Sequence, residues 1–191
     1  MMPEQHLSAS ERTYLLILAR QTIINACNNQ PLPEIDQDQL TPILRQEGAS
    51  FVTLTIDGYL RGCVGALEPY QSLAEDVREH AMAAAYQDYR FPPITTAEIK
   101  DIQIEISYLT RPEILNYDHP SDLLALLRPN IDGVVLRDGM RRATFLPQVW
   151  EKIPDPQDFL EQLCMKMGSA PDLWCRKKIE VFTYQVEEFH E

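Results

Sequence analysis

Residues 51–65 read F-V-T-L-T-I-D-G-Y-L-R-G-C-V-G, two short runs on either side of Asp57-Gly58. Residues 51–56 alternate two sets of side chains, which is the pattern of a half-buried strand. Asp-Gly is a dipeptide that type I′ hairpin turns favour, because both central residues of such a turn need a positive φ. The stretch therefore predicts an antiparallel hairpin whose second strand runs through residues 59–65.

Helices are predicted on both sides of this hairpin from capping residues and from apolar positions at helical spacing. Capping boxes of the form S-x-x-E begin at Ser8 and at Ser72, and an Asp-Pro pair at 155–156 gives a third start signal. The predicted helices span residues 11–28, 73–86 and 157–167, with a short one over residues 121–127. The second is rich in alanine, so it can pack closely against a neighbour.

Three further segments predict strands. Residues 99–109 alternate most cleanly, residues 133–146 form a second hairpin around Asp138-Gly139, and residues 179–186 form the last strand. Hairpins mixed with helices, without a regular strand–helix alternation, are typical of an α+β fold with antiparallel or mixed sheets and flanking helices.

Composition limits the classes of function. The chain has 191 residues, 45% of them hydrophobic, and 17 basic against 29 acidic side chains give a net charge of −12. That length fits one domain with room for a second small lobe, and the charge disfavours bulk nucleic acid and anionic lipid as partners. We find no apolar run long enough to cross a bilayer and no signal-peptide pattern at the start, so we expect a cytoplasmic protein.

The cysteines and histidines show no metal-binding spacing. Cysteines stand at 27, 63, 164 and 175 and histidines at 6, 80, 119 and 190, so there is no C-x-x-C pair. Glycine-rich nucleotide motifs are absent as well. We therefore expect no metal, no cofactor and reduced thiols.

Cys63 is the candidate nucleophile. A period of two places Arg61 and Cys63 on one face of their strand and directs Leu60 and Val64 into the core. A neighbouring guanidinium lowers a thiol pKa from its ordinary value near 8.5 and so increases the thiolate fraction. Gly62 and Gly65 leave room for a substrate or for another backbone. The alternative is a small buried cysteine in a strand with glycines at a bulge.

Glu105 is the second candidate catalytic residue. If its strand neighbours that of Cys63, a polar patch would form from Thr53, Thr55, Arg61, Cys63, Gln103 and Glu105. Glu105 would then orient Arg61 or act as a general base. A solvent-facing carboxylate is the alternative.

His80 and Arg90 each allow two interpretations. His80 lies near the apolar face of its helix and either reaches Cys63 as a base or is a hydrogen-bonded core histidine. Arg90, followed by Phe91 and two prolines, either binds an anion or caps the last helical carbonyls.

These residues resemble the AMMECR-one domain family, called in bacteria AmmeMemoRadiSam system protein A. The matching segments are F-V-T-L at 51–54, L-R-G-C-V-G at 60–65, D-Y-R-F-P-P at 88–93, I-E-I-S at 104–107, G-V-V-L at 133–136, F-L-P-Q-V at 145–149 and F-L-E-Q-L-C at 159–164. The resemblance covers residues 11–189. It implies a single α+β domain over residues 1–191 with two unequal lobes and the L-R-G-C-V-G motif near a groove between them. The small lobe would be built mainly from residues 58–100.

The resemblance also implies a function. Bacterial members are associated with a Memo-like protein and a radical SAM enzyme, and roles in nucleotide or RNA modification have been suggested. The matching site residues are Arg61, Gly62, Cys63, Gly65, Arg90, Phe91 and Glu105, whereas His80 is not among them. The sequence departs from the family pattern at Val64, where isoleucine is usual, and at Ala143, where glycine is frequent.

Two functions from different classes follow. The first is a catalytic component of a modification pathway that uses Cys63 as nucleophile or carrier beside Arg61 and Glu105. The second is a non-catalytic adaptor domain whose motif shapes a binding groove.

Overall fold

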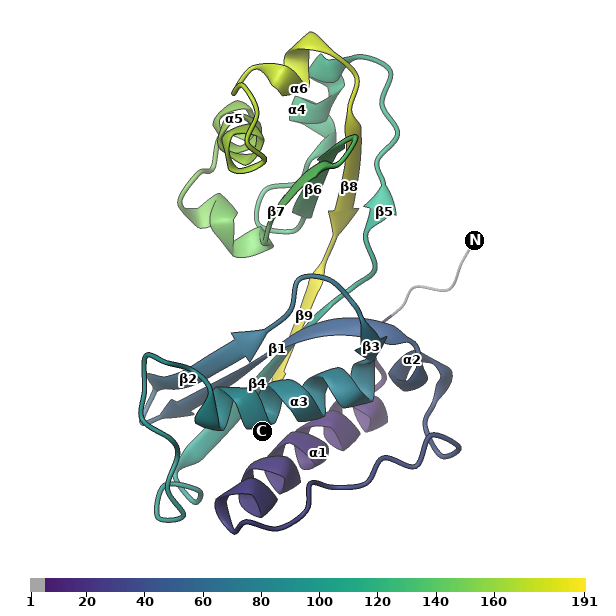
Figure 1. Ribbon diagram of the computed structural model, residues 1–191. Helices are drawn as coiled ribbons and strands as arrows, with labels where there is room; N and C mark the ends of the chain where they lie inside the picture. The colour runs from purple at the N-terminus through teal and green to yellow at the C-terminus, as the bar shows by residue number, and fades with distance from the viewer. Residues whose placement is uncertain (1–5) are drawn as a thin grey trace. The chain divides into compact units, whose positions relative to one another are not determined.

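The computed structural model describes residues 6–191, and the chain divides into two units (Figure 1). The first comprises the residues up to Thr110 together with Glu187–Glu191, and the second comprises Arg111–Val186. The second unit is thus inserted into the chain of the first. Residues 58–100, suggested above as a small lobe, lie inside the first unit, because they contribute a strand to its sheet and a helix that packs on that sheet.

The first unit is built on the predicted hairpin. Strand β1 (Glu47–Ile56) pairs with β2 (Tyr59–Gly65), and Asp57 and Gly58 have φ values of 52° and 79°, as a type I′ turn requires. Strand β4 (Ile102–Leu109) pairs antiparallel with the other side of β1, and β9 (Val186–His190) follows it, giving the order β2-β1-β4-β9. The short β3 (Gln71–Ser72) pairs with the start of β1.

Two helices cover one face of this sheet (Figure 1). Helix α1 (Ala9–Cys27) begins with the predicted capping box of Ser8 and Glu11, and α3 (Leu73–Tyr86) begins at the N-cap Ser72. A short helix, α2 (Pro42–Arg45), follows α1 in the chain and precedes β1. Leucine, isoleucine and valine side chains of α1, α3, β1 and β4 make the core. The face that carries Thr53, Cys63 and Glu105 is the opposite one.

A bulge corrects the expected orientation of the L-R-G-C-V-G strand. The register shifts so that Leu54 opposes Gly62 and Thr55 opposes Leu60, which leaves Arg61 as the extra residue. An extra residue reverses the alternation on one side of the bulge. Val64 therefore packs against the core as expected, whereas Leu60 is 42% exposed and the prediction that it points inward is wrong.

The second unit has its own sheet and core. Strands β5 (Glu113–Ile114), β6 (Gly133–Asp138), β7 (Arg141–Phe145) and β8 (Glu180–Tyr184) follow the order β5-β8-β6-β7. Its helices are α4 (Leu123–Leu126), α5 (Pro156–Lys166) and α6 (Leu173–Arg176), with 3-10 turns at Pro120–Asp122 and Pro147–Glu151. In the core, the ring of Trp150 stacks on that of Phe159, with the ring centroids 3.6 Å apart. The α+β prediction is confirmed.

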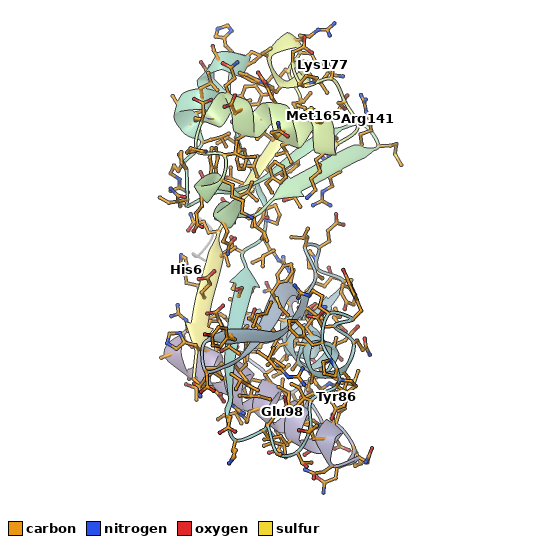
Figure 2. All side chains as sticks on the ribbon, turned by 90° about the vertical axis from the view of Figure 1, so that its left-hand side faces the viewer. His6, Tyr86, Glu98, Arg141, Met165 and Lys177 are labelled. Carbon is orange, nitrogen blue, oxygen red and sulfur yellow. The ribbon has the colours of Figure 1, made fainter. Side chains whose placement is uncertain are left out.

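The last predicted strand proves to be two strands. Residues 179–186 were expected to form one, but β8 ends at Tyr184 and β9 continues into the sheet of the first unit. Glu187 accepts hydrogen bonds from Arg12 Nη2 at 2.9 Å and from the backbone N–H of Leu7 at 3.3 Å, and His6, labelled in Figure 2, pairs with it at 2.6 Å. The C-terminal residues therefore complete the first unit. Among residues 6–191, we find no helix long and apolar enough to span a membrane.

Removing the phenyl ring of Phe189 in β9 should destabilise the first unit. Phe189 is only 7% exposed and packs in its core. We expect Phe189→Ala to lower the free energy of unfolding by about 3 kcal/mol, because a buried phenyl ring leaves a cavity. Ile17→Ala is the control, since Ile17 is 63% exposed and its loss should change stability by no more than about 0.5 kcal/mol. Equal effects of the two substitutions in urea denaturation would contradict this role of β9.

Candidate functional site

Cys63, Thr53 and Glu105 form a row across three strands. Cys63 of β2 opposes Thr53 of β1, and Thr53 opposes Glu105 of β4. The strands of Cys63 and Glu105 are therefore not neighbours, because β1 lies between them. Adjacent strands are about 4.8 Å apart, which puts Cys63 and Glu105 about 10 Å from each other on the same face. The condition set for the predicted polar patch, that these two strands be neighbours, is therefore not met. Five of its six residues still share this face, with Thr53 at the centre, whereas Arg61 does not join them.

The thiol of Cys63 has one hydrogen-bond partner in the described part of the chain. Thr53 Oγ1 donates to Cys63 Sγ at 3.3 Å, and the cysteine is half-buried. In an antiparallel sheet, two opposite residues whose N–H and C=O groups do not bond to each other bring their side chains closest together. Cys63 and Thr53 form such a pair, because the N–H and C=O of Cys63 point away from β1 and bind the loop after α3. A hydroxyl that donates to sulfur stabilises the negative charge that the sulfur carries when it attacks an electrophile.

The side chains of Asp88 and Arg90 bind the backbone N–H and C=O groups of Cys63. Its N–H donates to Asp88 Oδ2 at 2.9 Å, and its carbonyl accepts from Arg90 Nη2 at 3.3 Å. Arg90 also donates from Nε and Nη2 to the Asp88 carboxylate at 2.8 and 2.7 Å. These hydrogen bonds from Arg90 hold the pKa of the buried Asp88 well below its usual range, against the opposing effect of burial. We call Asp88 and Arg90 the bracket.

The bracket decides between the two interpretations of Arg90. The anion that Arg90 binds is Asp88 of the same chain, and none of its hydrogen bonds goes to a carbonyl of α3. Its guanidinium also lies over the ring of Phe91, 5.5 Å from the centroid. Arg90 is thus brought to the edge of β2, where it binds the backbone of Cys63, and Phe91 packs against its guanidinium.

Arg61 serves the following loop rather than the thiol. It donates to Glu98 Oε1 at 2.8 Å and to the carbonyls of Pro92 and Pro93 at 2.8 and 3.3 Å. The hydrogen bonds from Arg61 and from Thr95 lower the pKa of Glu98 to about 2. The suggested pairing of Arg61 with Glu105 is wrong, because the bulge turns Arg61 toward the sheet edge. The carboxylate of Glu105 forms no hydrogen bond or ion pair within residues 6–191.

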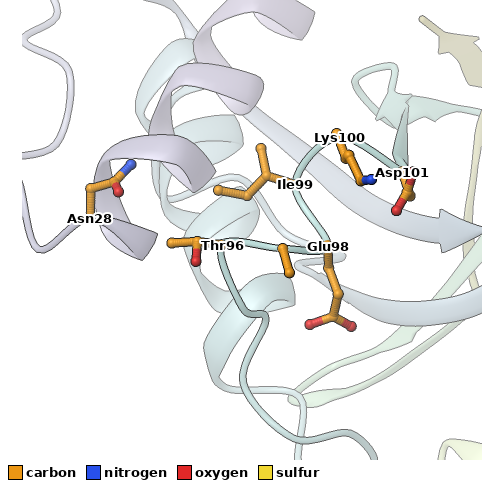
Figure 3. A pocket seen from close by; sticks show the side chains of 7 residues that line it. Asn28, Thr96, Glu98, Ile99, Lys100 and Asp101 are labelled. Carbon is orange, nitrogen blue, oxygen red and sulfur yellow. The ribbon is translucent and has the colours of Figure 1, made fainter.

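The loop that Arg61 holds forms one wall of a pocket of about 770 Å³ (Figure 3). Asn28, at the end of α1, and residues 96–101 line it. In the close-up, Thr96 and Ile99 extend on the side of Asn28, whereas the Glu98 carboxylate extends away from it. No sequence motif marks this pocket, so sequence reasoning missed it.

The two motif glycines make room for atoms of the chain itself. A Cβ at Gly62 would lie 2.1 Å from the carbonyl oxygen of Ala84, and one at Gly65 would lie 2.4 Å from the Phe51 ring. Gly62 thus lets α3 approach the sheet. Of the two expectations, approach of another backbone is confirmed for Gly62.

His80 cannot act on Cys63. It lies on α3, on the helix-covered side of the sheet, and its Nδ1 is 3.1 Å from Asp76 Oδ2. Cys63 is on the other face. The interpretation of His80 as a buried, hydrogen-bonded histidine is confirmed, since it is 5% exposed.

Sequence reasoning also missed Asp88 and Glu98, the acids that bind the two site arginines. Their signal was their position: Asp88 stands two residues before Arg90, and Glu98 follows the proline pair that Arg61 contacts. Asp88 opens the D-Y-R-F-P-P segment that carries part of the family resemblance, whereas Glu98 belongs to none of the matching segments.

Loss of the Asp88 charge should destabilise the protein in a pH-dependent way. We expect Asp88→Asn to cost about 2 kcal/mol at pH 7, because it weakens charge-assisted hydrogen bonds. A depressed folded-state pKa contributes stability above the unfolded value near 3.9 and loses it as pH falls toward the folded value. The difference from wild type should therefore shrink between pH 4 and pH 2.5, and the exposed Asp101→Asn should show none. A difference that stays constant in urea denaturation across this range would contradict the bracket.

Comparisons with known proteins agree with the resemblance seen in the motifs. The AMMECR1 family model matches residues 16–189. A protein of Methanothermobacter thermautotrophicus is 38% identical over 97% of this chain and 96% of its own length, and Protein MJ0810 of Methanocaldococcus jannaschii is 32% identical over 97% and 92%. The crystal structure of the uncharacterized protein PH0010 from Pyrococcus horikoshii superposes with a TM-score of 0.70 at 30% identity, covering 93% of this chain and 90% of that one. The chain therefore belongs to the AMMECR1 family.

Proposed function

We propose that the chain is a thiol-dependent component of a modification pathway, in which Cys63 receives an electrophilic group and passes it on. The observation that carries this proposal is the hydrogen bond from Thr53 Oγ1 to Cys63 Sγ on a polar sheet face. The bracket adds support, because it fixes the backbone of Cys63 and therefore the direction of its side chain. A fixed nucleophile loses less entropy when it reacts.

The step is a substitution at the substrate. The Cys63 thiolate forms a bond to an electrophilic carbon, while the bond from that carbon to its leaving group breaks and the leaving group keeps the electron pair. In a second substitution, a nucleophile of the acceptor bonds to the same carbon, and the C–S bond breaks with its electron pair returning to Cys63 as thiolate. The thiol loses its proton to water, and Glu105, about 10 Å from Cys63 on the same face, supplies a proton to the leaving group at the far end of the substrate. A substrate that bridges both groups lies across β1, over Thr53.

Charge narrows the substrate class. The first unit, which contains Cys63, has 18 acidic and 7 basic side chains, whereas the second has 11 and 10. A unit with a net charge of −11 repels polyanions. A protein or a small neutral or cationic molecule fits this field better than a nucleic-acid chain.

We further propose Memo-like and radical SAM proteins as partners and the cytoplasm as the location. The family resemblance supports the partners. All four cysteines of the chain are free thiols, which supports a reducing compartment.

A non-catalytic binding domain is the second candidate, and a different observation favours it. Arg61, Asp88 and Arg90 all bind groups of this chain, so much of the motif organises the loop at the edge of β2. In this case Cys63 would be a packing residue and the loop surface would bind the partner.

Removal of the Thr53 hydroxyl should slow alkylation of Cys63. We expect Thr53→Val to reduce its rate with iodoacetamide about 5-fold relative to the exposed Cys175, because one hydrogen bond contributes about 1 kcal/mol. Cys164 should react slowest, since burial raises the pKa of its thiol. Quantitative mass spectrometry of the labelled peptides measures all three rates. An unchanged ratio of Cys63 to Cys175 would contradict activation by Thr53.

The covalent function predicts a modified Cys63 in cells. Protein purified from its native source should carry an adduct on the Cys63 peptide, and Glu105→Gln should change the adduct's occupancy. The control Glu34→Gln removes a carboxylate from an exposed position of the same unit outside this face. Partner binding that survives Cys63→Ser, together with an unmodified Cys63 in every preparation, would support the binding domain instead.

A further inference from the structure

A second polar cluster lies inside the first unit, on the helix-covered side of the sheet. Ser50 of β1 and Asp76 of α3 are completely buried, and His80 is one turn further along α3. Ser50 Oγ donates to Asp76 Oδ2 at 2.6 Å, and His80 Nδ1 lies 3.1 Å from the same oxygen. Burying a carboxylate costs free energy unless it is hydrogen-bonded, and here one of its oxygens has two partners.

This geometry fixes which nitrogen of His80 carries the proton. The Asp76 carboxylate can only accept, so Nδ1 must donate to it. In the neutral ring Nε2 is then a bare acceptor. Nε2 has no hydrogen bond within residues 6–191, and, unlike Asp76 Oδ1, it is not sealed from solvent. His80 is thus a largely buried residue, 5% exposed, with an oriented lone pair that solvent can still reach.

The ring of Tyr70 stands beside His80, and the carboxylate of Glu79 stands beside Tyr70. The ring of Tyr70 meets that of His80 edge to face, with centroids 6.5 Å apart, and Tyr70 is 53% exposed. Glu79 accepts a hydrogen bond from Gln71 Nε2 at 2.7 Å and also pairs with the Tyr70 hydroxyl. Burial and the nearby Glu79 raise the pKa of Tyr70 to about 12, so the phenol stays neutral.

We propose that His80, Tyr70 and Glu79 form a binding site for an organic cation, an alkylammonium or guanidinium group. Nε2 and the Glu79 carboxylate accept its N–H groups, and the Tyr70 ring attracts its charge. An anion is disfavoured here by the Glu79 carboxylate and by the net charge of −11 of the unit. The cation comes from a free polyamine or from a lysine or arginine of a partner protein. This site is independent of Cys63, which lies on the other face of the sheet.

Histidine NMR tests the proposal directly. A ¹H–¹⁵N correlation of the four imidazoles should show His80 protonated at Nδ1 and bare at Nε2. Butylammonium and butylguanidinium should then shift the His80 signals to saturation and leave His6, His119 and His190 unchanged. A proton on Nε2 would overturn the proposal, and so would equal shifts at all four histidines, because those report only screening of the acidic unit.

Two variants and a matched control locate the cation. Glu79→Gln and Tyr70→Leu should each weaken binding at least 5-fold in the same titration. Glu34→Gln removes one negative charge from an exposed position of the same unit and should change the affinity less than 2-fold. Equal weakening by Glu79→Gln and Glu34→Gln would refute a defined site. Tighter binding of spermidine than of acetylated lysine and arginine peptides identifies a free polyamine, and the reverse order identifies a partner side chain.

Discussion

The hydrogen bonds from the bracket to the peptide of Cys63 are the contacts on which the candidate site depends. Strand β2 is an edge strand, and its outward N–H and C=O groups need partners. Asp88 and Arg90 supply both partners for Cys63, and Arg61 ties the continuation of the same loop through Glu98. A buried acid paired with an arginine is stable only as a complete set, because loss of one member leaves an uncompensated charge. The edge of the sheet and the loop are therefore one structural element.

The two faces of the sheet in the first unit carry different chemistry. On the face away from the helices, Cys63, Thr53 and Glu105 form a row of a thiol, a hydroxyl and an acid. On the helix-covered face, Asp76 and Ser50 orient His80. Two facts separate them: neighbouring residues of a strand point to opposite faces, and α3, which carries Asp76 and His80, covers only one of those faces. A thiol and a histidine within the same small unit therefore act independently.

Local patterns in the sequence predicted what local interactions determine. The turn at Asp57-Gly58, the capped helices and the α+β class followed from short-range preferences. The bulge at Arg61 did not, because it depends on how β2 is registered against β1. The partners of Arg61 and Arg90 were missed for the same reason, since they arise when a distant loop meets the strand edge. The insertion of the second unit before β9 likewise appears only in the assembled sheet.

Amide hydrogen exchange at Cys63 tests most directly whether the loop fixes the backbone of this residue. Its N–H bonds to a side chain of the loop and not to a neighbouring strand, so its protection reports the bracket itself. The account predicts that this amide exchanges as slowly as the amides of the central strand β1, and that Asp88→Ala accelerates it at least 10-fold while β1 stays protected. Rapid exchange in the wild-type protein, or exchange that Asp88→Ala leaves unchanged, would contradict the claim that the loop fixes Cys63.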